Sequence, residues 1–170
     1  MKNLREKIYS YPDFPEKGII FQDILGITQD PDLFKEIIIK MSSSSIIKNA
    51  DVIISIDARG FIFGTAIAMQ SSKPMIVARK PNKLPGKLLK RNYSLEYGEN
   101  SLSIQKNVAL KYERFAIVDD ILATGGTANC CIELIKSIEK KVNGLCVIAE
   151  IEDLKGRTNL KCPVDSQIKL

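Results

Sequence analysis

Two adjacent carboxylates and a loop of small residues form the segment of this sequence best suited to chemistry. Asp119 and Asp120 directly follow the apolar run 115–118. Two apolar residues then lead into a loop made of Ala123, Thr124, Gly125, Gly126 and Thr127. Glycines permit close backbone approach, and successive N–H groups at the start of a helix attract anions. The loop is therefore suited to a phosphate.

The carboxylates of Asp119 and Asp120 would repel that phosphate unless they hold hydroxyl groups or a divalent cation that bridges to the ligand. A sugar phosphate satisfies both conditions. The residues alone leave a second interpretation open, in which the segment is a glycine-rich turn capped by Asp and Thr side chains.

Two further segments place cations after apolar runs. Arg59 lies between Asp57 and Gly60, after the run 52–56. A basic group after the run 74–78 consists of Arg79, Lys80 and Lys83. A guanidinium matches phosphate oxygens with a planar fork, and three cations in one loop would neutralise a pyrophosphate. The alternative is that Asp57 caps a helix beside a surface arginine, and that the basic loop is merely solvated.

The elements that must position these residues alternate between apolar strands and helices. Continuous apolar runs at 52–56, 74–78, 115–118 and 145–151 alternate with helical patterns at 31–47, 60–70 and 126–140. This alternation is typical of a parallel sheet covered on both faces, and such sheets bind ligands beyond the carboxyl ends of their strands. The sequence thus predicts one three-layer α/β domain, residues 1–170, with a mostly parallel central sheet.

The remaining segments are less regular. Residues 2–9 predict a short helix, 19–21 an extended piece, and Asp30 a cap for a helix that begins at Pro31. Residues 80–91 read as a long mobile loop, and 93–97 with 102–105 as a β-hairpin around Gly98.

Composition narrows the class of protein. The 170 residues are 45% apolar, which favours one globular domain. Histidine is absent, which excludes His-based triads and His-ligated metals. The four cysteines lack CxxC spacing, and neither a signal peptide nor a membrane-spanning run is evident, so we expect a cytoplasmic location. The net charge of +5, without a dense basic block, favours a small phosphorylated ligand over nucleic acid.

The segment 115–127 resembles the phosphoribosyl pyrophosphate signature of type I phosphoribosyltransferases: an apolar strand, two acidic residues, two apolar residues and a small-Thr-Gly-Gly-Thr loop. The resemblance implies the type I fold with a hairpin and hood loop. It also implies that Asp119 and Asp120 hold the ribose 2′- and 3′-hydroxyls, and that the loop 123–127 wraps the 5′-phosphate. The Mg²⁺ it implies would be held mainly through the substrate, with no direct protein ligand assigned.

Several segments are similar to the adenine-specific members of that family. The Asp-Ala-Arg-Gly-Phe stretch resembles their pyrophosphate loop, and this implies that Arg59 grips pyrophosphate oxygens, joined by Arg79, Lys80 and Lys83. Residues 80–100 resemble a mobile hood. Leu95-Glu96-Tyr97-Gly98 implies that Glu96 is the acid/base group at purine N7, although a lone Glu in an alternating strand is usually a surface residue.

The N-terminal segment, about 1–30, resembles the family's base-binding region over residues 12–24. This implies that Phe21 stacks on adenine, while Ile20 and Gln22 supply backbone contacts. Gln22 stands where many relatives have Arg, and Ser103 where a Glu is common.

The implied activity is transfer of a 5-phosphoribosyl group from phosphoribosyl pyrophosphate to adenine, giving AMP and pyrophosphate. The resemblance also implies a homodimer with small-molecule substrates and no nucleic-acid or membrane partner. Two alternatives are a transferase for another nucleobase, such as xanthine or a pyrimidine, and a non-catalytic regulator that senses phosphoribosyl pyrophosphate. Regulators of that kind usually carry a DNA-binding domain, for which no residues are spare here.

Overall fold

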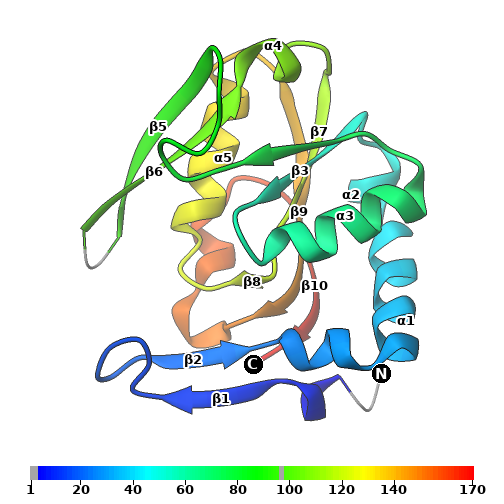
Figure 1. The fold of residues 1–170 in the computed structure, drawn as a ribbon, viewed down its shortest axis with the longest axis vertical. Helices are drawn as coiled ribbons and strands as arrows, with labels where there is room; N and C mark the ends of the chain where they lie inside the picture. The colour runs from blue at the N-terminus through cyan, green and yellow to red at the C-terminus, as the bar shows by residue number, and fades with distance from the viewer. Residues whose placement is uncertain (1–3, 96–97) are drawn as a thin grey trace.

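A parallel sheet forms the centre of the computed structural model, which describes residues 4–95 and 98–170 (Figure 1). Its strands run in the order β10-β9-β7-β3-β4, and β8 pairs with β9. The strands are β3 (Val52–Ile56), β4 (Met75–Ala78), β7 (Arg114–Val118), β8 (Ile121–Leu122), β9 (Lys141–Glu150) and β10 (Val164–Lys169). Each of these pairings is parallel, as the continuous apolar runs predicted.

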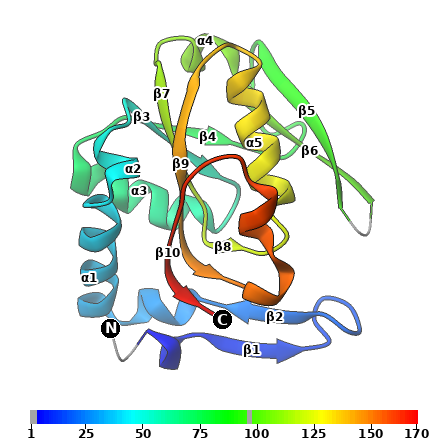
Figure 2. The same ribbon diagram turned by 180° about the vertical axis from the view of Figure 1, so that it is seen from behind.

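Helices cover the two faces of this sheet. The main ones are α1 (Pro31–Ser42), α2 (Ser45–Lys48), α3 (Gly60–Ser71) and α5 (Gly126–Lys136). Figures 1 and 2 show α5 on one side of β9 and α1 with α3 on the other. Side chains alternate along β3: Ile53 packs in the cluster that includes α1 and α3, whereas Ile54 packs in the cluster that includes α5. The predicted three-layer architecture is confirmed.

Two antiparallel hairpins and several short helices lie outside the sheet. The hairpins are β1 (Tyr9–Pro12) with β2 (Ile20–Asp23), and β5 (Leu88–Leu95) with β6 (Gly98–Gln105). The short helices are α4 (Lys106–Ala109), η1 (Arg5–Lys7), η2 (Leu25–Gln29), η3 (Glu152–Leu154) and η4 (Gly156–Asn159). The second hairpin joins the main sheet at Arg79 and Ser103, whose N–H groups donate to each other's carbonyl oxygens at 2.9 and 2.8 Å.

Several predicted boundaries are wrong for physical reasons. The helix expected at 31–47 is capped by Asp30 as predicted, but it stops at Ser42, and Ser44 caps a separate helix, α2. Serine side chains compete with the helix for backbone hydrogen bonds. The helix expected at 2–9 is only the 3-10 turn η1, because the residues after it pair with β2. The loop expected at 80–91 already enters β5 at Leu88.

Close packing of α3 on β3 depends on Gly64. A Cβ built at this glycine would overlap Ser55 Oγ and lie 2.6 Å from Ser55 Cβ. Both residues are buried, so the neighbouring atoms have little room to relax. The α3–β3 contact matters for the site because the loop between these two elements contains Arg59.

We expect Gly64→Ala to lower the free energy of unfolding by about 1–3 kcal/mol, because the overlap with Ser55 outweighs the better helix propensity of alanine. Urea denaturation followed by circular dichroism measures this. Gln70→Ala, at an exposed position of the same helix, is the matched control and should change stability little. Equal stability of Gly64→Ala and the wild type would contradict the packing argument.

An ion pair between the buried Glu150 and the partly exposed Arg157 joins β9 and β10 to η4. Glu150 is 5% exposed, and its carboxylate accepts from Arg157 Nε at 2.9 Å and from Nη2 at 2.5 Å. Arg157 Nη1 donates to the carbonyl of Val164 at 2.7 Å, and Ser166 Oγ donates to Glu150 at 3.0 Å. These hydrogen bonds hold the pKa of Glu150 below its ordinary value, with Arg157 as the largest cause.

Because the pKa of Glu150 is lower in the folded protein, its carboxylate stabilises the fold above the unfolded value of 4.5. That contribution is lost as the pH falls through the folded pKa. We expect Glu150→Gln to cost roughly 1–2 kcal/mol at pH 7, since the guanidinium of Arg157 is partly exposed, and the cost to shrink below pH 4.5. Thermal melts from pH 3 to pH 8 test this. Glu152→Gln, which removes an exposed ion pair with Lys169, is the control and should show almost no effect.

Candidate active site

The carboxyl ends of three neighbouring strands bring the predicted site segments to one edge of the sheet. In the parallel register, Ser55 of β3 lies beside Val118 of β7 and Val77 of β4. The chain leaves these strands into the segments that begin at Asp57, Asp119 and Arg79. The sequence prediction that they converge is thus confirmed at the level of the backbone.

The loop that follows β7 has the geometry of an anion site. Gly125 has a positive φ of 86° and directly precedes the first residue of α5, where the helix dipole favours negative charge. Its carbonyl accepts from the N–H of Asn129 at 2.8 Å, so α5 continues without a break from the loop. The one element in this stretch that the sequence did not predict is the short strand β8 between the carboxylates and the loop.

A second segment, Gly156–Asn159, braces this loop, and sequence reasoning missed it. A Cβ built at Gly156 would overlap the carbonyl oxygen of Ala123. Asn159 Nδ2 donates to the carbonyl of Thr124 at 3.0 Å. The partners are more than thirty residues apart, so no local pattern reveals the contact. The only local signal was a glycine in a polar turn.

The adjacent carboxylates Asp119 and Asp120 occupy different environments. Asp120 is 7% exposed, and its Oδ2 lies 2.5 Å from Nε of Arg59. Asp119 is only half-buried, and its Oδ1 accepts from the N–H of Asp120 at 2.9 Å. Crowding by protein atoms and the charge of Asp120 raise the pKa of Asp119 well above its ordinary value. A nearby cation would oppose this rise.

Arg59 connects three segments of the site. Besides its contact with Asp120, its Nη1 donates to the carbonyl of Gln22 at 3.1 Å, and its guanidinium lies 4.8 Å from the centre of the Phe21 ring. Phe21 in turn meets Phe14 edge to face, with ring centroids 5.2 Å apart. The residue predicted to grip pyrophosphate therefore also contacts the predicted base-binding strand. No local sequence pattern indicates this contact.

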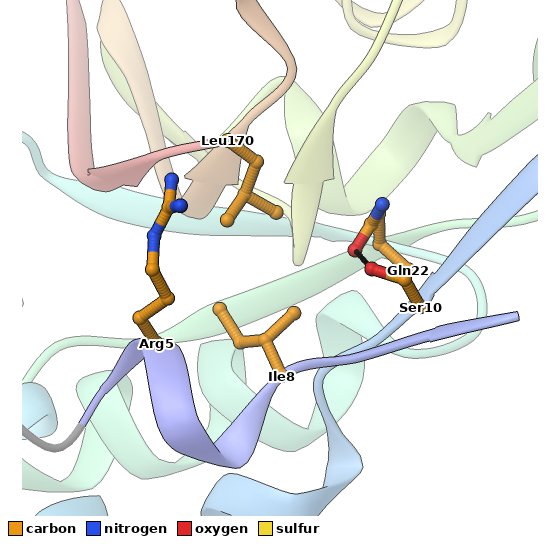
Figure 3. A pocket seen from close by; sticks show the side chains of 5 residues that line it. All are labelled: Arg5, Ile8, Ser10, Gln22 and Leu170. Carbon is orange, nitrogen blue, oxygen red and sulfur yellow. Dashed lines mark hydrogen bonds between the residues drawn. The ribbon is translucent and has the colours of Figure 1, made fainter.

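The side chain of Gln22 contacts the neighbouring strand β1. It accepts from Ser10 Oγ at 2.8 Å and lines a cavity of about 220 Å³ with Arg5, Ile8 and Leu170, shown in Figure 3. The Gln22 amide, at the position where many relatives have Arg, thus forms a hydrogen bond within the β1–β2 hairpin. The neighbouring Ile20 is 60% exposed.

Arg79 anchors the basic loop. Its Nε donates to Asp57 Oδ2 at 3.1 Å, its Nη1 donates to the carbonyl of Lys83 at 3.2 Å, and it lies 5.7 Å from the ring centre of Phe61. Lys80 and Lys83 are both exposed. The loop therefore presents two lysines at the edge of the sheet, while Arg79 ties it to the Arg59 segment.

Glu96 lies outside the described residues. The flanking residues Leu95 and Gly98 pair with each other across the β5–β6 hairpin. Further along β5, Arg91 Nη2 lies 3.6 Å from Glu133 of α5, and the Arg91 carbonyl accepts from Cys130 Sγ at 3.4 Å. The hairpin is thereby held against α5, the helix that begins directly after the loop 123–125.

The described residues contain neither a cluster of metal ligands nor a helix that could span a membrane. Within residues 4–95 and 98–170, no three His, Cys, Asp or Glu side chains gather closely enough to hold a metal ion. Across the same residues, no helix is both long and apolar enough to cross a bilayer.

Comparisons with known proteins agree with this geometry. Residues 27–161 match the family model of the phosphoribosyl transferase domain. Two similar proteins are adenine phosphoribosyltransferases of Prochlorococcus marinus strain MIT 9515, at 64% identity over 97% of this chain and 96% of that protein, and of Mycoplasmopsis synoviae, at 44% identity over 98% of both.

Solved structures show the same fold. The adenine phosphoribosyltransferase of Thermoanaerobacter pseudethanolicus superposes with a TM-score of 0.94 at 36% identity, over 99% of both chains. That of Saccharomyces cerevisiae, in complex with D-2,5-dideoxy-2,5-imino-altritol 1,6-bisphosphate and adenine, gives 0.85 at 34% identity, over 98% of this chain and 97% of its own. Because the similarity extends over the whole chain and includes the segments that converge at the sheet edge, the chain belongs to the phosphoribosyl transferase family, and within it to the adenine phosphoribosyltransferases.

Proposed function

We propose that this protein transfers the 5-phosphoribosyl group of phosphoribosyl pyrophosphate to N9 of adenine, releasing pyrophosphate and forming AMP. The observation that carries the proposal is the position of Arg59, which contacts Asp120 of the phosphoribosyl signature and also the Phe21–Gln22 strand. A group that touches both segments is well placed to align the two substrates. The relatives named above support the same activity.

In this proposal the 5′-phosphate is held by the loop 123–127 together with the first N–H groups of α5. Asp119, which is partly buried, accepts from one ribose hydroxyl, and Asp120 accepts from the other as it shares Arg59 with the pyrophosphate. Arg59, with the loop cations Arg79, Lys80 and Lys83, neutralises the pyrophosphate oxygens. Adenine stacks on Phe21, while the backbone of Ile20 and Gln22 reads the purine edge.

The reaction is a displacement at ribose C1′, in which N9 of adenine replaces pyrophosphate. The bond to the leaving group is largely broken before the new bond forms, so positive charge develops on the sugar. Catalysis then consists mainly of positioning both substrates and of stabilising charge on the leaving group. Glu96 holds a proton at N7 while N9 attacks.

Mg²⁺ fits this site as an ion carried by the substrate. Mg²⁺ is usually bound through one or two carboxylates together with substrate oxygens, and Asp119 is a partly buried carboxylate whose raised pKa a cation would lower. When bound, the ion neutralises the charge of the departing pyrophosphate. The orienting and proton-holding roles remain with Arg59 and Glu96.

Four further features belong to this proposal. The chain acts as one domain, 1–170, with a base-binding segment at about 1–30 and a mobile hood at about 80–100. It forms a homodimer, for which the exposed Ile62 and Met69 of α3 offer apolar surface. It works in the cytoplasm, which suits four free cysteines. It binds small-molecule substrates and has no nucleic-acid or membrane partner.

We expect AMP and pyrophosphate when the protein is given phosphoribosyl pyrophosphate, Mg²⁺ and adenine, and no nucleotide with guanine, hypoxanthine or xanthine. Chromatography of the products measures both. Turnover of a different base would overturn the assignment of the Phe21 pocket but leave the fold standing. Binding of phosphoribosyl pyrophosphate without turnover of any base would point to the regulator.

Replacing Glu96 with Leu should lower kcat about 10²–10⁴-fold, because the proton at N7 is no longer stabilised, while the affinities for both substrates change far less. Steady-state kinetics together with equilibrium binding separate the two effects. Glu99→Leu, at a carboxylate three residues along the chain, is the control. A kcat near the wild-type value would remove Glu96 from the mechanism.

A further inference from the structure

The phosphate loop is held in place by a segment that sequence reasoning did not connect with the site. Gly125 and Gly156 face each other so closely that a Cβ built at Gly125 would lie 2.9 Å from the carbonyl oxygen of Gly156. The buried Leu160 lies on the same side, 3.4 Å from that built atom. A larger residue at either glycine would push the loop away from the segment.

One side chain makes a directed polar contact with the loop. Asn159 Nδ2 donates to the carbonyl of Thr124 at 3.0 Å, although Asn159 is exposed and lies 35 residues further along the chain. The Thr124 carbonyl belongs to the peptide unit whose N–H is that of Gly125. A hydrogen bond to this carbonyl therefore fixes the orientation of a peptide plane inside the proposed phosphate cradle.

The segment has a rigid anchor of its own. Arg157, two residues before Asn159, is bound by the buried carboxylate of Glu150 and by the carbonyl of Val164. Ser166 of β10 completes this network through its hydrogen bond to Glu150. The end of the central sheet is in this way connected through Arg157 and Asn159 to Thr124.

We propose that Asn159 is a positioning residue for the 5′-phosphate loop. In this proposal the ion pair between Arg157 and Glu150 keeps Asn159 next to the Thr124 carbonyl. The inference rests on the proposed function, because it takes the loop 123–127 as the 5′-phosphate site. Donors that are already aimed at a ligand bind it more tightly than donors that must first be ordered. Asn159 therefore acts on the phosphoribosyl end of the substrate and not on the pyrophosphate or the base.

The test compares Asn159→Ala with the wild type by calorimetric titration of ribose 5-phosphate and, separately, of inorganic pyrophosphate. We expect ribose 5-phosphate to bind about three- to tenfold more weakly, as for the loss of one hydrogen bond, and the dissociation constant of pyrophosphate to change less than twofold. In turnover, the KM for phosphoribosyl pyrophosphate should rise while the KM for adenine stays within twofold.

Two variants serve as controls. Thr158→Ala removes a hydroxyl that donates to the carbonyl of the nearby Lys155 at 2.7 Å, and it should leave the binding of both ligands as in the wild type. Thr127→Val alters the loop itself and should weaken the binding of ribose 5-phosphate.

If Thr127→Val weakens the binding of ribose 5-phosphate and Asn159→Ala does not, the positioning role is overturned and the loop assignment stands. If neither variant has an effect, the loop assignment itself is wrong. Equal weakening of ribose 5-phosphate and pyrophosphate by Asn159→Ala would reveal a general loss of structure and would also overturn the positioning role.

Discussion

The parallel pairing of β3 with both β4 and β7 is the constraint on which the rest of the site depends. Parallel strands end at the same edge, so the pairing brings together the segments after Ile56, Ala78 and Val118 from distant parts of the chain. Each strand is apolar on both faces because helices cover both sides of the sheet. The core and the site are therefore consequences of one arrangement, since the residues that bury the sheet also fix where its polar ends lie.

Arg59 links this edge to the N-terminal hairpin. The hairpin β1–β2 is not part of the central sheet, yet Arg59 reaches the carbonyl of Gln22 and the ring of Phe21. Its other contact is the buried Asp120, so the position of the guanidinium is restricted from two directions. Under the proposed function, this one side chain would couple charge neutralisation at the pyrophosphate with binding of the base.

Local patterns identified most of the elements and failed where pairing partners are distant. The runs at 52–56 and 115–118 were recognisable as strands because a continuous apolar run predicts a buried strand even when the pairing strand is unknown. The helix expected at 2–9 overlaps β1 only at Tyr9, and the strand itself was not predicted because its pairing with β2 decides its conformation. β10 was missed because its sequence is largely polar. Glu96, identified from its motif, lies outside the described residues.

The sequence by itself determined the chemical groups available to this protein, namely the acidic pair, the Thr-Gly-Gly-Thr loop and the order of the cation-bearing segments. These are local motifs, and a local motif can be recognised without knowledge of the tertiary structure. Only the tertiary structure decided which of these groups contact one another and how deeply each is buried. It paired Asp120 with Arg59, left Asp119 only partly buried, and placed Asn159 against Thr124. The physical reason is that contacts between residues far apart in the chain depend on sheet register and on helix packing, and neither is written in any single stretch of residues.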